Sequence, residues 1–281
     1  SDLFGGDTGL PVPYLGGLVL GRRAVLRRLF ELESTYDDTD HPTDTHSVEI
    51  DLTYRCNLGC GSCDRSCGRV PPGEDMSIEQ VRGFIAESER RGYDWRRIRI
   101  MGGEPFMHPD IGRILTEFSG YASRHPGCLV EVYTNGIGGI PEGVPENIAV
   151  HNTRKDVRPN RFDPYNLAPA DLNPGYRPRG CWITTDCGVG LNVHGFYCCA
   201  AGAALDRLFG FGLASGWADD PGIERGKATL CRYCGHGVYP GYRGRDERPL
   251  IGEAELMSES WREVLSRSSS GRGTQLGRWG E

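Results

Sequence analysis

The sequence lacks any run that approaches the roughly 20 apolar residues of a membrane-spanning helix. The apolar stretch from Leu15 to Leu20 is short and arginines follow it, which does not match a secretory signal. Positive charge is in deficit, since the formal net charge is -6, and this disfavours binding to nucleic-acid phosphates. We therefore expect a cytoplasmic protein that binds neither a membrane nor nucleic acid.

Glycine and cysteine are abundant instead, with 41 and 11 residues. Glycine occurs at about twice its average usage of roughly 7%, which indicates many turns and close backbone contacts. The odd number of cysteines leaves at least one outside any complete set of disulfides. In a chain without a visible export signal, clustered cysteines favour metal or cluster ligation.

Alternating and apolar segments in the first half predict four strands, with amphipathic helices between the first three. The first strand alternates strictly from Val48 to Leu52, and the first helix begins with a capping box of Ser77 and Gln80. The β-α-β-α-β order predicts a parallel sheet with helical crossovers. The strands are expected at residues 48–52, 98–100, 129–134 and 148–151.

Three cysteines follow the first strand directly, in the order Cys56-x3-Cys60-x2-Cys63. Three thiolates on one loop can hold three irons of a [4Fe–4S] cube and leave the fourth iron open to a small molecule. The stretch from Thr53 to Cys63 closely resembles the signature loop of radical S-adenosylmethionine (SAM) enzymes. In that family the open iron binds SAM, and reduction cleaves SAM to methionine and a 5'-deoxyadenosyl radical that abstracts hydrogen from a substrate.

Two further elements match the family in the expected order. Gly102-Gly103-Glu104-Pro105 ends the second strand, and the resemblance implies that its backbone and Glu104 receive the SAM amino group. Tyr133-Thr134-Asn135-Gly136 ends the third strand and matches the TNG element, so that Thr134 and Asn135 would line the SAM site.

The fourth strand leads into a polar stretch, and parallel strands of such barrels carry their chemistry at these ends. Asn152 could bond the SAM ribose, while Arg154 or Lys155 could hold the SAM carboxylate or orient a polar substrate. A solvated basic turn is the alternative interpretation.

The signature loop departs from the family at one position. Ser62 stands immediately before the third cysteine, where the family usually has an aromatic residue that contacts adenine. Cys67 extends the cysteine series, and we interpret it as a packing thiol because a fourth ligand would block SAM.

A second cysteine group has the spacing Cys181-x17-Cys199-x31-Cys231-x2-Cys234. It resembles the twitch module, a shortened SPASM domain, which implies one auxiliary [4Fe–4S] cluster around a hairpin with its turn at His194-Gly195. A structural zinc site is the alternative, since zinc also favours four thiolates.

The remaining cysteines are assigned less directly. Cys198 competes with Cys199 for the second ligand position, and we favour Cys199 because its distance from Gly195 is closer to the usual step in the module. Cys128 and Cys187 are interpreted as small buried hydrophobic residues.

The resemblance covers roughly residues 46 to 240 and implies a partial (β/α) barrel. Cys181 comes only about 30 residues after the fourth strand, which is too short for two more β-α units, so we expect a truncated α/β barrel of four or five strands. A small C-terminal twitch-like Fe–S module would follow it. The predicted division is an N-terminal extension (1–45), the partial barrel (46–175), the auxiliary module (176–245), and a C-terminal helix with a mobile tail (246–281).

A short barrel with a twitch-like module resembles the radical SAM dehydrogenases that oxidise aminocyclitols or sugar alcohols. This implies oxidation of an alcohol to a ketone in a small polar substrate, with the auxiliary cluster as electron acceptor and a flavodoxin or ferredoxin as reductant. A peptide maturase, an epimerase and a zinc-binding interaction protein are the alternatives. The GGEP and TNG elements argue against the last, because a zinc scaffold does not need them.

Overall fold

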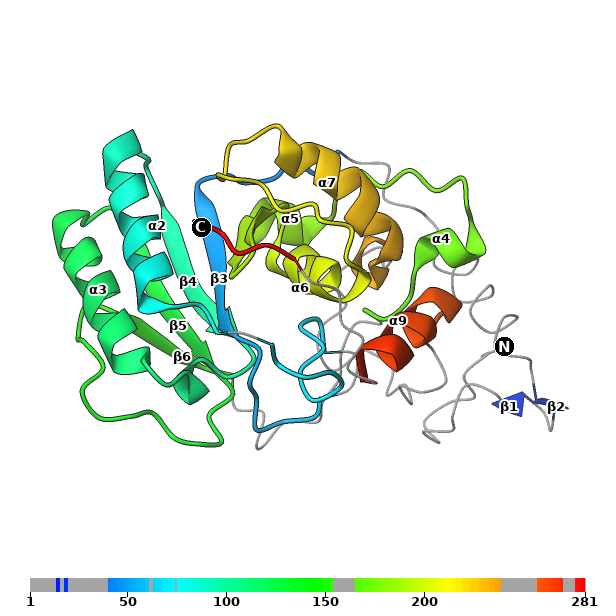
Figure 1. The fold of residues 1–281 in the computed structure, drawn as a ribbon, viewed down its shortest axis with the longest axis horizontal. Coiled ribbons are helices and arrows are strands. Elements are labelled where there is room, and N and C mark those ends of the chain that lie inside the picture. The colour runs from blue at the N-terminus through cyan, green and yellow to red at the C-terminus, as the bar shows by residue number, and fades with distance from the viewer. Residues whose placement is uncertain are drawn as a thin grey trace.

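The computed structural model forms a mixed six-stranded sheet with helices on both sides (Figure 1). It describes residues 14–15, 18–19, 40–60, 63–73, 75–153, 165–238, 257–269 and 276–280. The strand order is β6-β5-β4-β3-β7-β8, and all neighbours are parallel except β7 and β8. The predicted α/β fold with a parallel core is therefore confirmed. The strands are β3 (Ser47–Thr53), β4 (Arg97–Gly102), β5 (Leu129–Thr134), β6 (Ala149–Asn152), β7 (Val189–Asn192) and β8 (Gly195–Tyr197).

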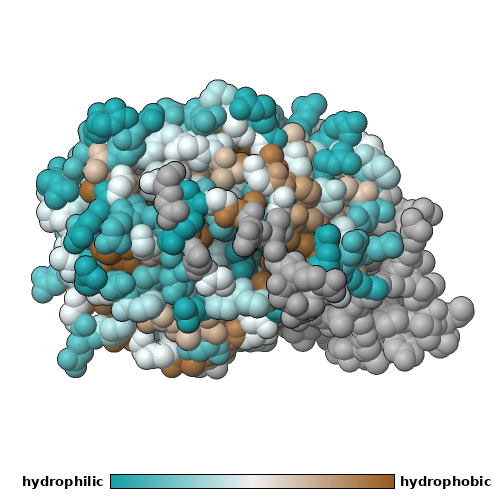
Figure 2. All heavy atoms as spheres, viewed as in Figure 1, coloured by the Kyte–Doolittle hydropathy of each residue, from teal (hydrophilic) through white to brown (hydrophobic). Residues whose placement is uncertain are grey.

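Helices α2 (Ile78–Arg91) and α3 (Ile111–Arg124) cover the side of the sheet that we call the outer face. The predicted capping box of Ser77 and Gln80 is present, and Gly92 ends α2 in the left-handed conformation. Alternate strand residues such as Val48 and Ile50 are fully buried in one core with the helix residues. Hydrophilic residues predominate on the exposed side of these helices (Figure 2).

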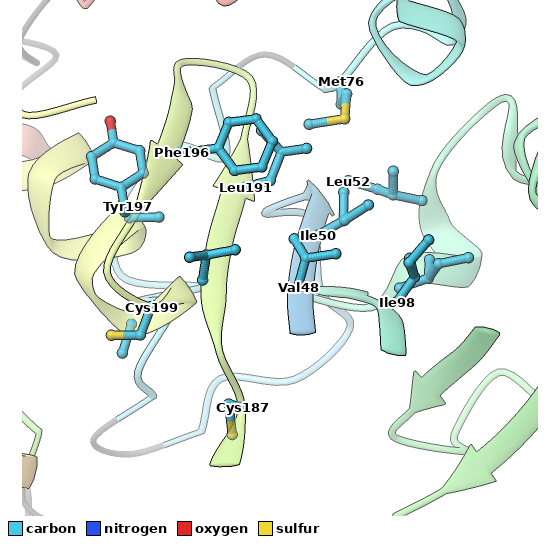
Figure 3. Packing of buried hydrophobic residues seen from close by; sticks show 14 of the residues in the cluster. Val48, Ile50, Leu52, Met76, Ile98, Cys187, Leu191, Phe196, Tyr197 and Cys199 are labelled. Carbon is cyan, nitrogen blue, oxygen red and sulfur yellow. The ribbon is translucent and has the colours of Figure 1, made fainter. Parts of the chain in front are cut away.

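The opposite side, which we call the inner face, carries the other residues of each strand. At its β7 edge the inner face is covered by α6 (Ala200–Phe209). Gly190 allows this contact, because a Cβ there would lie 2.4 Å from the backbone nitrogen of Ala200. Asn192 then bonds the carbonyl of Ala203 at 3.5 Å. Cys199, the N-cap of α6, is thereby fixed beside the sheet (Figure 3).

The hairpin of the second half differs from the prediction in the position of its turn. β7 pairs in parallel with β3, so the hairpin continues the main sheet. Asn192 pairs with Gly195, which makes Val193 and His194 the two turn residues. The turn predicted at His194-Gly195 is one residue too late, because Gly195 with φ of 136° already belongs to β8.

The chain beyond the sheet is mainly helical, and its end is packed. Trp279 donates its backbone N–H to Val193 and its indole N–H to Gly216, and it accepts a bond from Gln80. The tail predicted to be mobile is therefore held against the fold at this residue. The helices are α4 (Pro169–Leu172), α5 (Trp182–Asp186), α7 (Gly222–Leu230) and α9 (Glu259–Ser269), with short 3-10 turns η2 (Pro105–Met107), η3 (Cys231–Tyr233) and η4 (Gly235–Val238).

The first 39 residues are described only as a small hairpin of β1 (Tyr14–Leu15) and β2 (Leu18–Val19). The helix predicted from Leu20 to Glu33 lies outside the described residues. Among the helices that the structure does describe, none has both the length and the apolar character needed to span a membrane.

Replacing Gly190 with alanine should detach the start of α6 from the sheet. The new Cβ would meet the backbone of both Cys199 and Ala200 within 2.5 Å, and neither can move aside as a flexible side chain would. We expect a loss of roughly 3 kcal/mol and a fall of about 6–12 °C in the apparent unfolding midpoint, measured by circular dichroism. Gly83→Ala is the control, because a Cβ there meets no atom of the described residues within 4 Å. Equal midpoints for the two variants would contradict this packing.

Candidate active site

The end of β3 and the end of β4 are joined by an unusually close backbone contact. Gly103 N–H donates to Thr53 O, and Glu104 N–H donates to Arg55 O, both at 2.7 Å. A Cβ at Gly102 or Gly103 would stand 2.2 Å from the same two carbonyl oxygens. The two glycines of the GGEP element are therefore required to bring β4 against the segment that leads into Cys56.

Glu104 connects this contact to the third strand. The residue is 3% exposed, and its side chain accepts bonds from Thr134 Oγ1 at 2.9 Å and from the Asn135 backbone N–H at 2.8 Å. The Asn135 amide nitrogen in turn lies 3.8 Å from Cys56 Sγ and donates to Asn57 at 2.7 Å. The three predicted motifs are thus brought together, and the TNG element touches the cysteine loop.

The first cysteine group lies on the loop after β3. Cys60 is buried, while Cys56 and Cys63 are half-buried. Cys67 is buried beneath the loop, where it packs with Tyr54 and against both Cys56 and Cys63. A hydrogen bond from Cys67 lowers the pKa of Cys63 to about 6, which favours the thiolate that iron requires. Ser62, at the unusual position of the loop, lies outside the described residues.

These residues fit the cluster that the resemblance implies. Three soft sulfur donors stand on one loop, and an amide nitrogen of Asn135 faces one of them. Among the described residues, no atom lies within 4 Å of the place that a Cβ at Gly59 would take. Hydrogen bonds to the sulfurs of such a cluster tune its reduction potential. Cys56, Cys60 and Cys63 would hold this cluster.

The second cysteine group converges on one pocket. The structure places the four predicted ligands there and adds two residues that the spacing did not select, Cys198 and His236. The sulfur of Cys234 lies 3.4 Å from His236 Nδ1. Although no three such side chains in the described residues converge on a single ion, the ligands of a cube lie farther apart than those of an ion. The pocket cysteines are Cys181, Cys198, Cys199, Cys231 and Cys234.

Cys198 and Cys199 differ within this pocket. Cys199 Sγ accepts the backbone N–H of Gly202 at 3.3 Å, as the N-cap of α6. A hydrogen bond from Cys198 lowers the pKa of Cys199, and the same contact raises the pKa of Cys198. Gly202 leaves room for the two sulfurs, since a Cβ there would lie 3.3 Å from Cys198 Sγ. The helix start therefore favours a thiolate at Cys199.

Helix α6 connects the two cysteine groups. Its N-cap, Cys199, lies in the second pocket, whereas Ala204 packs with Tyr54 and Cys67 beneath the first loop. Five residues of helix separate Cys199 from Ala204, which corresponds to about 7.5 Å along the axis. Helix α6 therefore contacts both groups of thiols.

Buried charges line the inner face between these groups. Arg65, from the cysteine loop, donates to Glu49 at 2.9 Å and to Asp51 at 3.3 Å. Arg99 of β4 donates to Glu49 at 3.1 Å and stands 3.6 Å from Glu131 of β5. Burial raises the pKa of Asp51 to about 6 against the opposing effect of Arg65. Strand alternation could have indicated this polar face, but not that a loop arginine completes it.

The other predicted residues are placed as follows. Asn152 lies against Gly136. A Cβ added at Gly136 would lie 2.2 Å from Oδ1 of Asn152. Arg154 and Lys155 lie outside the described residues. Cys128 and Cys187 are both in the apolar core, and burial raises the pKa of each thiol. Cys187 stands just before β7, apart from Cys199 (Figure 3).

Comparison with known proteins places the family match on the segment of the chain that contains the first three motifs. Residues 50–149 match the model of the Radical SAM superfamily. Mycofactocin maturase MftC of Mycobacterium tuberculosis is 38% identical over 92 residues, which are 33% of this chain and 22% of the maturase. A probable GTP 3',8-cyclase of Archaeoglobus fulgidus is 33% identical over 90 residues, 31% of this chain and 29% of the cyclase. The chain thus matches less than a third of the length of these curated relatives.

Two solved structures are also similar. BtrN in complex with AdoMet and 2-DOIA aligns with a TM-score of 0.42 and 14% identity, over 69% of this chain and 94% of BtrN. Streptococcus suis SuiB bound to its precursor peptide SuiA aligns with a TM-score of 0.28 and 17% identity, over 44% of this chain and 27% of SuiB. The family match and the three motifs joined by Glu104 lead to one conclusion: residues 50–149 form a radical SAM domain, for which the family implies a [4Fe–4S] cluster and SAM.

Proposed function

We propose that this protein is a radical SAM enzyme that oxidises an alcohol of a small polar substrate to a ketone. Cys56, Cys60 and Cys63 hold the SAM-binding cluster, and Cys181, Cys199, Cys231 and Cys234 hold an auxiliary [4Fe–4S] cluster. When bound, the first cluster and SAM supply a 5'-deoxyadenosyl radical, and the second cluster accepts an electron. A sugar or an aminocyclitol is the proposed class of substrate, and a flavodoxin or ferredoxin the proposed reductant.

The observation that carries this proposal is the second pocket of cysteines, together with the helix α6 that contacts both this pocket and the first loop. Loss of a hydrogen atom and a proton from a carbinol leaves one electron that needs an acceptor. A second cluster held at Cys199, on the helix that also packs beneath the first loop, would meet that need. A single-cluster isomerisation has no use for these additional thiols.

The chain's own residues position SAM and the substrate. Glu104 holds Thr134 and Asn135 beside Cys56, so the SAM side of the site is fixed before anything binds. The polar inner face, with Arg99 and Glu131 almost buried, offers charged donors and acceptors to a hydroxylated molecule. Asn152 is proposed to bond the SAM ribose, and Arg154 or Lys155 to orient the substrate hydroxyl.

Peptide modification is the second candidate. The segment shared with mycofactocin maturase favours it, since that protein by its name matures a peptide. The two candidates differ in product, because oxidation removes two hydrogens from a small molecule and a maturase changes the mass of a peptide.

The direct test is turnover by the reconstituted protein with SAM and dithionite. A panel of sugars, cyclitols and aminocyclitols should yield one compound that loses two hydrogens, in equal amount with 5'-deoxyadenosine. Cys56→Ala should cleave no SAM. Incorporation of solvent deuterium without oxidation would instead identify an epimerase, and 5'-deoxyadenosine formed only with a peptide would identify a maturase.

The choice between the adjacent cysteines can be tested by iron content. Cys199→Ala should lower the iron content of the reconstituted protein from about eight to about four irons per chain, because it removes the ligand at the start of α6. Cys198→Ala is the matched control and should keep about eight. A loss of iron in Cys198→Ala alone would reverse the assignment.

A further inference from the structure

A histidine and a glutamate form a pair at the edge of the inner face. His151 Nε2 lies 2.7 Å from Glu131 Oε1, and the glutamate side chain is 7% exposed. The second oxygen of Glu131 faces Arg99 at 3.6 Å, which fixes the carboxylate from its other side. The ring of His151 stacks on Tyr133, with centroids 4.6 Å apart and an angle of 20° between the planes. The imidazole is thus held at one edge by a hydrogen bond and on one side by the aromatic ring.

The hydrogen bond determines which nitrogen of His151 can accept a proton. An ionised carboxylate only accepts hydrogen bonds, so Nε2 carries the hydrogen that points to Glu131. In the neutral ring Nδ1 then has the free lone pair. The side chain of His151 is 44% exposed, so a ligand can reach it. The carboxylate of its partner Glu131 is only 7% exposed.

The location of the pair is next to the SAM side of the site. Tyr133 and His151 are partners in the register of β5 and β6, and both directly precede residues of the predicted SAM site, Thr134 and Asn152. The backbone of Thr153 then bonds Thr134 O at 2.9 Å, which ties the end of β6 to the TNG element.

We propose that His151, oriented by Glu131, is the base that takes the hydroxyl proton of the substrate. The inference rests on the proposed alcohol oxidation. The carbinol hydrogen atom passes to the 5'-deoxyadenosyl radical and forms 5'-deoxyadenosine, the hydroxyl proton passes to Nδ1 of His151, and the remaining electron passes to the auxiliary cluster. The C–O bond becomes C=O, and atoms and electrons balance.

Apart from Glu49, which already accepts bonds from Arg65 at 2.9 Å and from Arg99 at 3.1 Å, Asp51 is the other carboxylate of the inner face that could be considered. Its side chain is fully buried, with 0% exposure, and Arg65 occupies one oxygen at 3.3 Å. A substrate hydroxyl therefore cannot approach it without breaking the contact of the cysteine loop. His151 is reachable and Asp51 is not.

The test compares His151→Gln with a matched histidine on the outer side. His125 also stacks on a tyrosine, at 4.2 Å, lies 3.6 Å from Glu89, and is 40% exposed. With the alcohol that the wild type oxidises, His151→Gln should lower ketone formation by about 100-fold or more while SAM is still cleaved. His125→Gln should keep the wild-type rate. Exogenous imidazole should restore part of the activity of His151→Ala, which a purely structural residue would not allow.

A second measurement is independent of turnover. In 15N-histidine spectra of the oxidised holoenzyme, His151 should carry its hydrogen on Nε2, and Glu131→Gln should change that tautomer ratio. A hydrogen found on Nδ1 would overturn the assignment of His151 as the base. Ketone formation by His151→Gln within about threefold of the wild-type rate would overturn it as well. If the wild type oxidises no alcohol, the proposed function fails and the role of His151 fails with it, whereas full activity of His151→Gln overturns only this inference.

Discussion

The site depends on the close backbone contact between the end of β3 and the start of the GGEP element. Two hydrogen bonds of 2.7 Å and two glycines without a Cβ hold the carbonyls of Thr53 and Arg55 against β4. Because this contact precedes Cys56 directly, it sets where the cysteine loop leaves the sheet. Glu104 extends the same contact to β5, so three strands fix one loop.

A second set of contacts places the other cysteines relative to that loop. Because Gly190 has no Cβ, the start of α6 can pack closely on the inner face, and Cys199 caps that helix. Further along α6, Ala204 packs beneath the first loop with Cys67. The charged inner face lies beside both groups, and Arg65 joins it to the cysteine loop through buried ion pairs. Removing one partner of such a pair leaves an uncompensated buried charge, which is strongly destabilising.

Local patterns in the sequence were sufficient to predict the parallel strands, the capping box at Ser77 and the three motifs. They could not determine that β7 pairs with β3, because the partner of a strand is set by packing far along the chain. For the same reason, local patterns could not predict that His236 lines the second pocket or that Trp279 packs against the fold. His151 was visible as part of a polar stretch, but its pairing with Glu131 depends on the register between β5 and β6.

The central claim is that two separate groups of cysteines each hold a four-iron cluster. The most direct measurement is iron and sulfide per chain after anaerobic reconstitution, in the wild type and in a variant with Cys56, Cys60 and Cys63 all changed to alanine. The account predicts about eight irons in the wild type and about four in the variant. A variant without iron would contradict it, because the second group would then be a zinc site or a set of plain thiols.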